Sequence, residues 1–217
     1  VREKISLGGV DGLANIVKLW HHVLKEDNGD ISMALNSGEV LRGRLHEDFK
    51  GEGGRLLGRC FDLKAAYKQC AVHPADAAVS VFAHGSSEIE GGVAFYRAHA
   101  LPFGSGASVV GFNRAAAGLK ACMNRCFSVP VDNLFDDYPV VAPAAVTETL
   151  GRTFKKCAEI TGWVLRDGDK DKDFAPTFDV LGVVFDLTAV TKEGAMVVKN
   201  TETRTKALCE QLSSALS

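Results

Sequence analysis

Two acidic segments, each set in apolar and strand-like sequence, constrain the fold of this chain more than any other feature. They are residues 61–63 (Phe-Asp-Leu) and 135–138 (Phe-Asp-Asp-Tyr), and they lie far apart in the chain. Asp62 follows a short buried strand and the pair lies at a turn, so one sheet can bring the three carboxylates together. Carboxylate oxygens are natural ligands of Mg²⁺. Two such ions stabilise both the attacking and the leaving oxygen of an in-line displacement, so the pattern suits nucleotidyl transfer.

The composition allows a packed core and limits the partners. The 217 residues are 46% hydrophobic and 24% charged, which is typical of a folded soluble chain. There is no secretory pattern at the start and no apolar run of about 18 residues. We therefore expect no membrane partner and an intracellular location, cytoplasmic or nuclear.

The net charge restricts nucleic-acid binding to a local basic surface, and the cysteine spacing argues against a zinc site. With a net charge of −2, a nucleic-acid partner would need a local basic surface. The scattered candidates, each more typical of a solvated surface charge, are Arg42, Arg44, Arg55, Arg59, Arg114, Lys120 and Arg125. The six cysteines lack the two close pairs of a zinc site, which indicates buried thiols in a reducing compartment.

Periodicity predicts interleaved helices and strands. Apolar residues at helical spacing predict helices over 13–23 and 146–158, and residues 201–217 are expected to form an amphipathic helix. A composition rich in small residues predicts a further helix over 108–127. Apolar runs predict strands over 59–63, 79–83, 93–98 and 178–187, with a strand-turn-strand over 129–141. The Gly-rich residues 48–58 are expected to form a loop. Because the predicted strands and helices do not follow a regular βαβ repeat, we expect an α+β fold, an antiparallel sheet backed by helices.

Four segments, in order along the chain, resemble the motifs of reverse transcriptases. Residues 59–74 are similar to the first motif, Asp-Leu-x-x-Ala-Tyr-x-Gln, and the matching residues are Asp62, Leu63, Ala66, Tyr67 and Gln69. Residues 101–114 are similar to the second motif, with matches at Leu101, Pro102, Phe103, Gly104, Phe112 and Asn113. Residues 134–137 (LFDD) resemble the Tyr-x-Asp-Asp box, and residues 180–185 (VLGVVF) resemble the primer-grip strand.

The resemblance implies a polymerase palm with part of the fingers. Residues 1–54 would be partial fingers and the connection to the palm, residues 55–190 the palm, and residues 191–217 a C-terminal helix that starts a thumb or connection. The implied activity is RNA-directed DNA synthesis by a retrotransposon-type element. Its partners would be an RNA or DNA template with primer and deoxynucleoside triphosphates. The oligomeric state is left open.

The resemblance also assigns roles to individual residues. The two Mg²⁺ ions, or Mn²⁺ in their place, would be held by Asp62, Asp136 and Asp137. Tyr67 would pack under the incoming sugar and exclude a 2′-hydroxyl. The residues expected to shape the nucleotide and template pocket are Phe103, Gly104, Gln69 and Asn113. Either Lys170 or Lys172 would lie near the triphosphate, although both fall in a run of alternating charges typical of a solvated loop.

The chain departs from the family pattern at several places. Leu134 replaces the usual Tyr of the acidic box, and Val109 stands where many members have Pro. The basic fingers motifs, a full thumb and an RNase H signature are missing, so the chain is expected to be part of a longer polyprotein or a degraded retroelement that is inactive alone.

Other sites and functions fit the sequence less well. The acidic run 167–173 lacks the Gly and Glu positions of an EF-hand, and residues 104–109 lack the third Gly of a dinucleotide fingerprint. An RNA-directed RNA polymerase is one alternative, against which the aromatic Tyr67 counts. An inactive, palm-derived nucleic-acid-binding module or retroelement relic is the other, against which the three intact carboxylates count.

Overall fold

A two-stranded antiparallel unit lies at the centre of the computed structural model, which describes residues 8–25, 29–168, 171–180 and 182–216. Helices and small antiparallel sheets make up these residues, in agreement with an α+β class. The helices are α1 (Val10–Leu24), α2 (Gly106–Cys126), α3 (Ala144–Ile160), α4 (Val190–Glu193) and α5 (Glu202–Leu216). The strands are β1 (Asp30–Ala34), β2 (Val40–Arg44), β3 (Leu56–Asp62), β4 (Val81–Gly85), β5 (Val93–Arg97), β6 (Asp137–Pro143), β7 (Thr177–Val180), β8 (Val183–Asp186) and β9 (Val197–Asn200).

The central unit pairs β3 with β6 in antiparallel register. Pairing runs from Leu56 opposite Pro143 to Asp62 opposite Asp137. Nearly every residue of both strands is buried, which explains their almost continuous apolar sequence, because strands covered on both faces need no polar alternation. The two aspartates therefore lie at one end of a buried two-stranded sheet.

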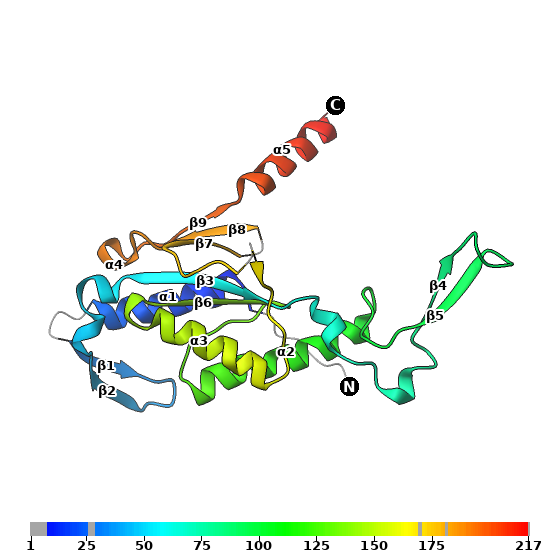
Figure 1. Ribbon diagram of the computed structural model, residues 1–217. Coiled ribbons are helices and arrows are strands. Elements are labelled where there is room, and N and C mark those ends of the chain that lie inside the picture. The colour runs from blue at the N-terminus through cyan, green and yellow to red at the C-terminus, as the bar shows by residue number, and fades with distance from the viewer. Residues whose placement is uncertain (1–7, 26–28, 169–170, 181, 217) are drawn as a thin grey trace.

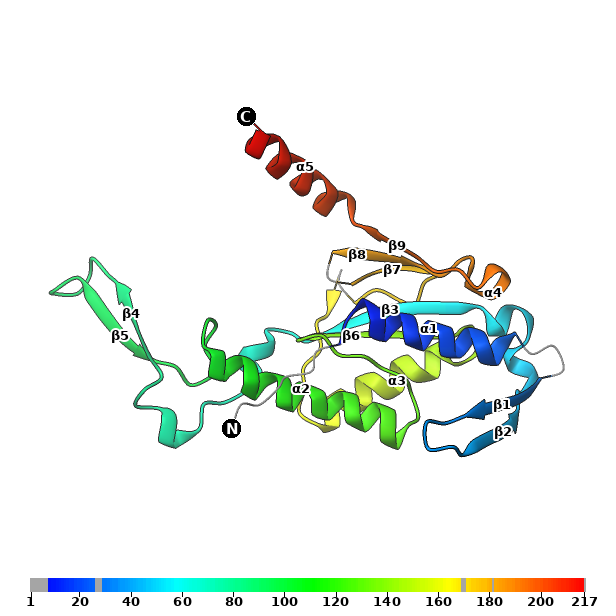
Figure 2. The ribbon, with the colours of Figure 1, turned by 180° about the vertical axis from the view of Figure 1, so that it is seen from behind.

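Side chains of β6 alternate between two hydrophobic cores. Tyr138 and Val140 pack with α2 and α3, whereas Val141 packs with α1, β7 and β8. Helix α3 lies in front of the strands in Figure 1 and α1 lies in front of them in Figure 2. The indole of Trp20 in α1 also donates a hydrogen bond to the carbonyl of Val141, at 2.9 Å. The central strands are thus held from both sides.

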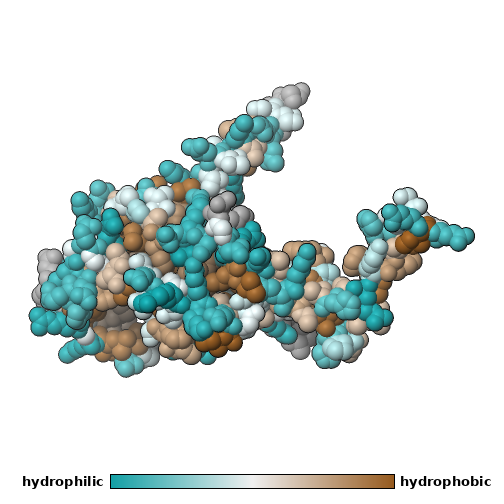
Figure 3. Space-filling model, in the orientation of Figure 1, coloured by the Kyte–Doolittle hydropathy of each residue, from teal (hydrophilic) through white to brown (hydrophobic). Residues whose placement is uncertain are grey.

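Two segments project from this body. The hairpin of β4 and β5 extends away beyond the start of α2, and α5 points away from the strands (Figures 1 and 2). The hairpin carries apolar side chains in solvent, among them Phe95 at 76% and Phe82 at 54% exposure, and it has brown surface in Figure 3. Every described side chain of α5 from Glu202 to Ser214 is also exposed.

The structure corrects some sequence-based expectations. The strand predicted over 178–187 is wrong as a single element, because the chain reverses near Gly182 (φ 76°) and forms the β7–β8 hairpin. The loop predicted over 48–58 contains the 3₁₀ helices Glu47–Phe49 and Gly51–Gly54, and its last residues already belong to β3. The first arm predicted within 129–141 makes only isolated bridges, such as Val131 with Val140. The β1–β2 hairpin, α4 and β9 were not predicted.

Gly58 in β3 is required by close packing across the two sheets. A Cβ atom at this position would overlap the ring of Phe178 in β7. We expect Gly58→Ala to lower the free energy of unfolding by about 2–3 kcal/mol, as overpacking does in a filled core. The measurement is urea denaturation.

Gly118 provides the matched control, because no atom outside its own helix turn lies within 4 Å of a Cβ built there. Gly118→Ala is expected to stabilise α2 by about 0.5–1 kcal/mol. Equal effects of the two substitutions would contradict the packing assigned to Gly58.

Candidate functional site

Three carboxyl groups gather at one end of the β3–β6 pair. Asp62, the last residue of β3, is paired in register with Asp137, the first residue of β6. Asp136 precedes Asp137, and its carbonyl accepts a hydrogen bond from the Leu63 N–H at 3.1 Å. The predicted juxtaposition of the two acidic segments is therefore present. Like charges placed opposite one another on neighbouring strands destabilise a sheet, so this end of the sheet costs stability.

A tight turn presents the acid pair. Leu134 and Asp137 exchange two backbone hydrogen bonds of 2.9 and 3.1 Å, which leaves Phe135 and Asp136 as the two turn residues. Phe135 has φ 55°, in the left-handed region. A two-residue hairpin turn with positive φ at its first central residue usually has Gly there. A phenylalanine in this position stores about 1–2 kcal/mol of backbone strain.

The electrostatics of the site show a shortage of positive charge. The pKa of Asp137 is raised to about 6 by burial first, and then by the negative charges of Asp136 and Asp62. Burial and the neighbouring Asp137 also raise the pKa of the Cys60 thiol. The pKa of Tyr67 is raised by burial and by Asp136. A bound cation would reverse this tendency for the carboxyl groups.

Arg166 supplies a counter-charge to Asp62. Its Nε lies 3.1 Å from Oδ2 of Asp62, and its backbone N–H donates to the Asp62 carbonyl at 2.8 Å. Sequence reasoning missed both Arg166 and Cys60 as neighbours of the aspartates. The only signal for Cys60 was its place two residues before Asp62 in a strand, which puts both on one face.

The donor set suits a hard divalent cation, although its side chains are not assembled around one. Three carboxylates provide the oxygen ligands that Mg²⁺ and Mn²⁺ prefer. Within the described residues, no three acidic, His or Cys side chains are grouped closely enough to hold a metal ion. Binding would thus require Asp62, Asp136 or Asp137 to change rotamer, and Asp62 to share its carboxylate with Arg166 or release it.

Two predicted nucleotide-binding aromatics lie together. Tyr67, in the 3₁₀ helix Ala66–Gln69, is 4.8 Å from Phe103 between ring centroids and stacks on Phe112 at 4.6 Å. Phe103 is 74% exposed. Next to it, Gly104 has φ 87°, with open space where a Cβ would stand. Tyr67 is half-buried, whereas most of the Phe103 side chain is open to solvent.

Gln69 and Asn113 are engaged within the protein. The Gln69 amide donates to the carbonyls of Lys64 (2.6 Å) and Val164 (2.9 Å), and its oxygen accepts from the Val164 N–H at 2.7 Å. Buried Asn113 donates to the Val109 carbonyl at 2.8 Å within α2. These bonds give both side chains a structural role, and their contact with a nucleotide stays a prediction.

Of the two lysines predicted near the triphosphate, Lys172 alone falls within the described residues. Lys170 lies outside the described residues. Lys172 is exposed and its Nζ lies 3.4 Å from Oδ2 of Asp179.

A cleft of about 660 Å³, which sequence reasoning did not predict, opens between the start of α2 and the base of the β4–β5 hairpin, where Pro102 and Ser105 line it.

Four of the basic candidates are either engaged in ion pairs or remote from the aspartates. Arg59 is buried and binds Asp171 at 2.5 Å, and Lys120 binds Asp132 at 2.7 Å. Arg42 and Arg44 are exposed on β2, which lies at the far end of the central strands from Asp62 (Figure 1).

Comparison with known proteins does not place this chain in a family. No protein-family model matches it, and a search of curated proteins found no relative. Among the described residues, no helix combines the length and the apolar character needed to cross a membrane.

The raised pKa of Asp137 predicts a pH dependence of stability. The folded protein binds this proton up to about pH 6, whereas the unfolded chain releases it near the ordinary value of 3.8. Between these values the folded state holds more protons, so stability falls as pH rises. We expect Asp137→Asn to remove this fall and to raise stability at neutral pH by about 1 kcal/mol, after allowance for solvent screening.

Urea denaturation of the wild-type protein and Asp137→Asn at acidic and neutral pH checks this prediction. Asp173→Asn, at an exposed position, is the matched control and should keep the wild-type pH dependence. Parallel pH profiles for the wild-type protein and Asp137→Asn would show that Asp137 titrates normally.

Proposed function

We propose that this chain is the palm region of an RNA-directed DNA polymerase of the retrotransposon type. The observation that carries the proposal is the register of β3 and β6, which sets Asp62 opposite Asp137 with Asp136 in the adjoining turn. The order of the four reverse-transcriptase-like motifs along the chain, two of which contain these aspartates, also supports it. The finer assignment of the α+β fold as a polymerase palm is part of the same proposal.

Under this proposal the chain's own residues have distinct tasks. Asp62, Asp136 and Asp137 hold the cations. Bound Mg²⁺ supplies the positive charge that neutralises a triphosphate and lowers the pKa of a primer 3′-hydroxyl. Because phosphoryl transfer depends mainly on positioning and electrostatics, the remaining residues orient the substrate. Tyr67, supported by Phe103 and Phe112, offers a rigid aromatic surface for the sugar.

The proposal is tested by primer extension on an RNA template with Mg²⁺, using the chain extended upstream to restore the fingers motifs and supplying deoxynucleotides or ribonucleotides in separate reactions. Incorporation of deoxynucleotides, with little from ribonucleotides, is the expected result. A preference for ribonucleotides would replace the proposal with an RNA-directed RNA polymerase. Binding of Mn²⁺ to the protein, followed by electron paramagnetic resonance, tests the cation site without requiring synthesis.

A non-catalytic nucleic-acid-binding module is the second candidate. The ion pair of Arg166 with Asp62 favours it, because it neutralises one of the three carboxylates without a metal. Template binding that is independent of divalent cations, together with no synthesis by folded protein, would support this candidate over the first.

A further inference from the structure

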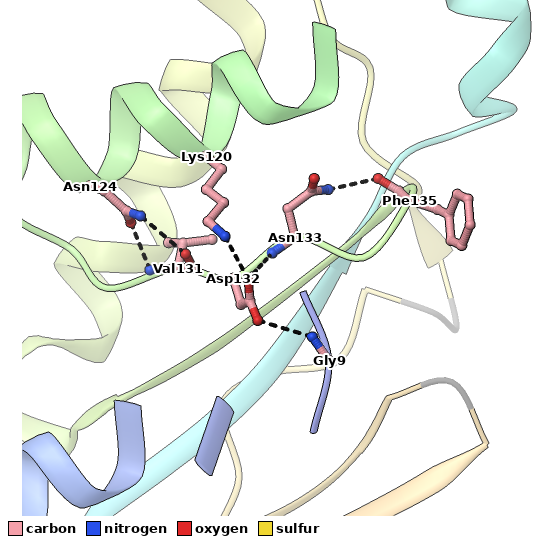
Figure 4. Close-up of polar contacts among 7 residues, drawn as sticks. All are labelled: Gly9, Lys120, Asn124, Val131, Asp132, Asn133 and Phe135. Atoms are coloured by element: carbon pink, nitrogen blue, oxygen red, sulfur yellow. Dashed lines mark hydrogen bonds and ion pairs between the residues drawn. The ribbon is translucent and has the colours of Figure 1, made fainter. Parts of the chain in front are cut away.

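Asn133 lies directly before the acidic turn and bonds to its backbone. This side chain is only 6% exposed, and its Nδ2 donates to the carbonyl of Phe135 at 2.7 Å. Figure 4 shows the amide of Asn133 directed at that carbonyl. The contact spans the connection that leads into Asp136 and Asp137. Asn133 lies outside the four motif-like segments of the sequence.

The turn has a physical need for such a bond. Phe135 holds a positive φ, which a residue with a Cβ adopts only when its surroundings enforce it. The two backbone bonds between Leu134 and Asp137 close the turn but leave the Phe135 carbonyl to other donors. The Asn133 amide supplies one, and so favours the strained conformation over relaxed alternatives.

Asp132 in turn holds Asn133 in place. Oδ1 of Asp132 accepts from the backbone N–H of Asn133 at 2.8 Å and from Nζ of Lys120 in α2 at 2.7 Å. Oδ2 accepts from the N–H of Gly9 at 3.2 Å. Figure 4 shows Asp132 between the start of α1 and helix α2. The carboxylate is 5% exposed and ties both helices to the turn connection.

The N-terminal glycines make this arrangement sterically possible. A Cβ atom at Gly8 or Gly12 would overlap the Asp132 carboxylate. The N–H of Gly8 also donates to the carbonyl of Asn133 at 2.8 Å. The connection is therefore fixed from α1 and α2 together, while the Asn133 side chain remains the element that reaches the turn.

We propose that Asn133 is a positioning residue that holds the Phe135 turn in its left-handed conformation and thereby presents Asp136 and Asp137 to a divalent cation. The metal-binding part rests on the proposed function, whereas the holding of the turn does not. Ligand-orienting side chains of this kind typically change metal affinity by about tenfold or more when removed.

The experiment uses two measurements on the same variants. Asn133→Ala is expected to weaken Mn²⁺ affinity about tenfold, measured on folded protein by electron paramagnetic resonance. It is also expected to speed hydrogen exchange of the Leu134 and Asp137 N–H groups by about tenfold. Without the Asn133 side chain, opening of the turn no longer requires the bond to the Phe135 carbonyl to break. Both values are compared with those of the wild-type protein.

Asn124→Ala is the matched control for lost hydrogen bonds. The Asn124 side chain makes two bonds to the backbone of Val131, of 2.9 and 3.3 Å, on the same connection but farther along the chain from the acid pair. This variant is expected to lose stability while its Mn²⁺ affinity and turn exchange change less than about twofold.

Phe135→Gly is expected to rescue the effects of Asn133→Ala. It would not do so if Asn133 only contributed to overall stability. Glycine adopts a positive φ without a steric penalty, so the turn should then depend less on Asn133. In this background, Asn133→Ala is expected to change Mn²⁺ affinity and turn exchange less than about twofold relative to Phe135→Gly alone. Non-additivity of this kind identifies the backbone of Phe135 as the target of the Asn133 bond.

The outcomes separate this inference from the proposed function. Unchanged exchange at Leu134 and Asp137 in Asn133→Ala overturns the positioning role. Faster exchange with wild-type Mn²⁺ affinity overturns its link to the metal. If Asp136→Asn leaves the Mn²⁺ affinity of the protein unchanged, the proposed cation site fails, and the exchange measurement alone still decides whether Asn133 holds the turn.

Discussion

Asp136→Asn is expected to abolish deoxynucleotide incorporation, with a loss of at least about a hundredfold to a thousandfold. The amide keeps the shape of the side chain but removes the charge that a divalent cation needs. Asp62→Asn should have a comparable effect, because Asp62 completes the carboxylate group from the neighbouring strand. Primer extension on an RNA template and Mn²⁺ titration measure both losses.

Stability is expected to respond differently in the two variants. Asp136→Asn removes a negative charge that, after burial, raises the pKa of Asp137, so the free energy of unfolding at neutral pH should rise by less than it does in Asp137→Asn; such a gain is common where function opposes stability. Asp62→Asn also breaks the ion pair with Arg166 and should bring no such gain. Loss of activity with undiminished folding is the signature of a functional carboxylate.

Asp173→Asn is the control, because Asp173 is an exposed aspartate outside the carboxylate group. It should change incorporation less than about twofold. If Asp136→Asn and Asp173→Asn have similar, small effects in a protein that synthesises DNA, the catalytic carboxylates lie elsewhere and the proposed site is wrong.

Phe154→Ala is expected to be the most destabilising of these substitutions, by about 3–5 kcal/mol. Phe154 in α3 is fully buried. Its ring stacks on Phe61 at 4.0 Å between centroids and meets Tyr138 edge-on at 5.5 Å. Truncation leaves a cavity behind the two strands and also removes both aromatic contacts. Urea denaturation monitored by circular dichroism gives the value.

The loss of the Phe154 ring should disturb the carboxylate site as well as the core. Phe61 precedes Asp62 and Tyr138 follows Asp137, so Phe154 supports the two strands directly beside the carboxylates. Ile160→Ala, at a position of the same helix that is 74% exposed, should cost less than about 0.5 kcal/mol. A similar cost for both variants would contradict the packing of α3 on this face.

Some parts of the fold followed from local pattern and others did not. The apolar spacing of Leu13 and Val17 predicted α1, because one face of this helix is buried. The β1–β2 hairpin was missed, since none of its side chains is fully buried and the alternation of Ile31 and Met33 with exposed residues is confined to the five residues of β1. The β7–β8 reversal was missed because apolar residues continue on both sides of Gly182, and only its backbone conformation marks the turn.

The sequence by itself determined which carboxylates can meet. Asp62 at a strand end and Asp136–Asp137 at a turn follow from short-range apolar pattern, which sets where strands begin and end. The tertiary structure alone decided what surrounds them: Arg166 beside Asp62, and Asn133 against the Phe135 turn. These contacts depend on how helices and strands pack across long chain separations, and local periodicity carries no information about such partners.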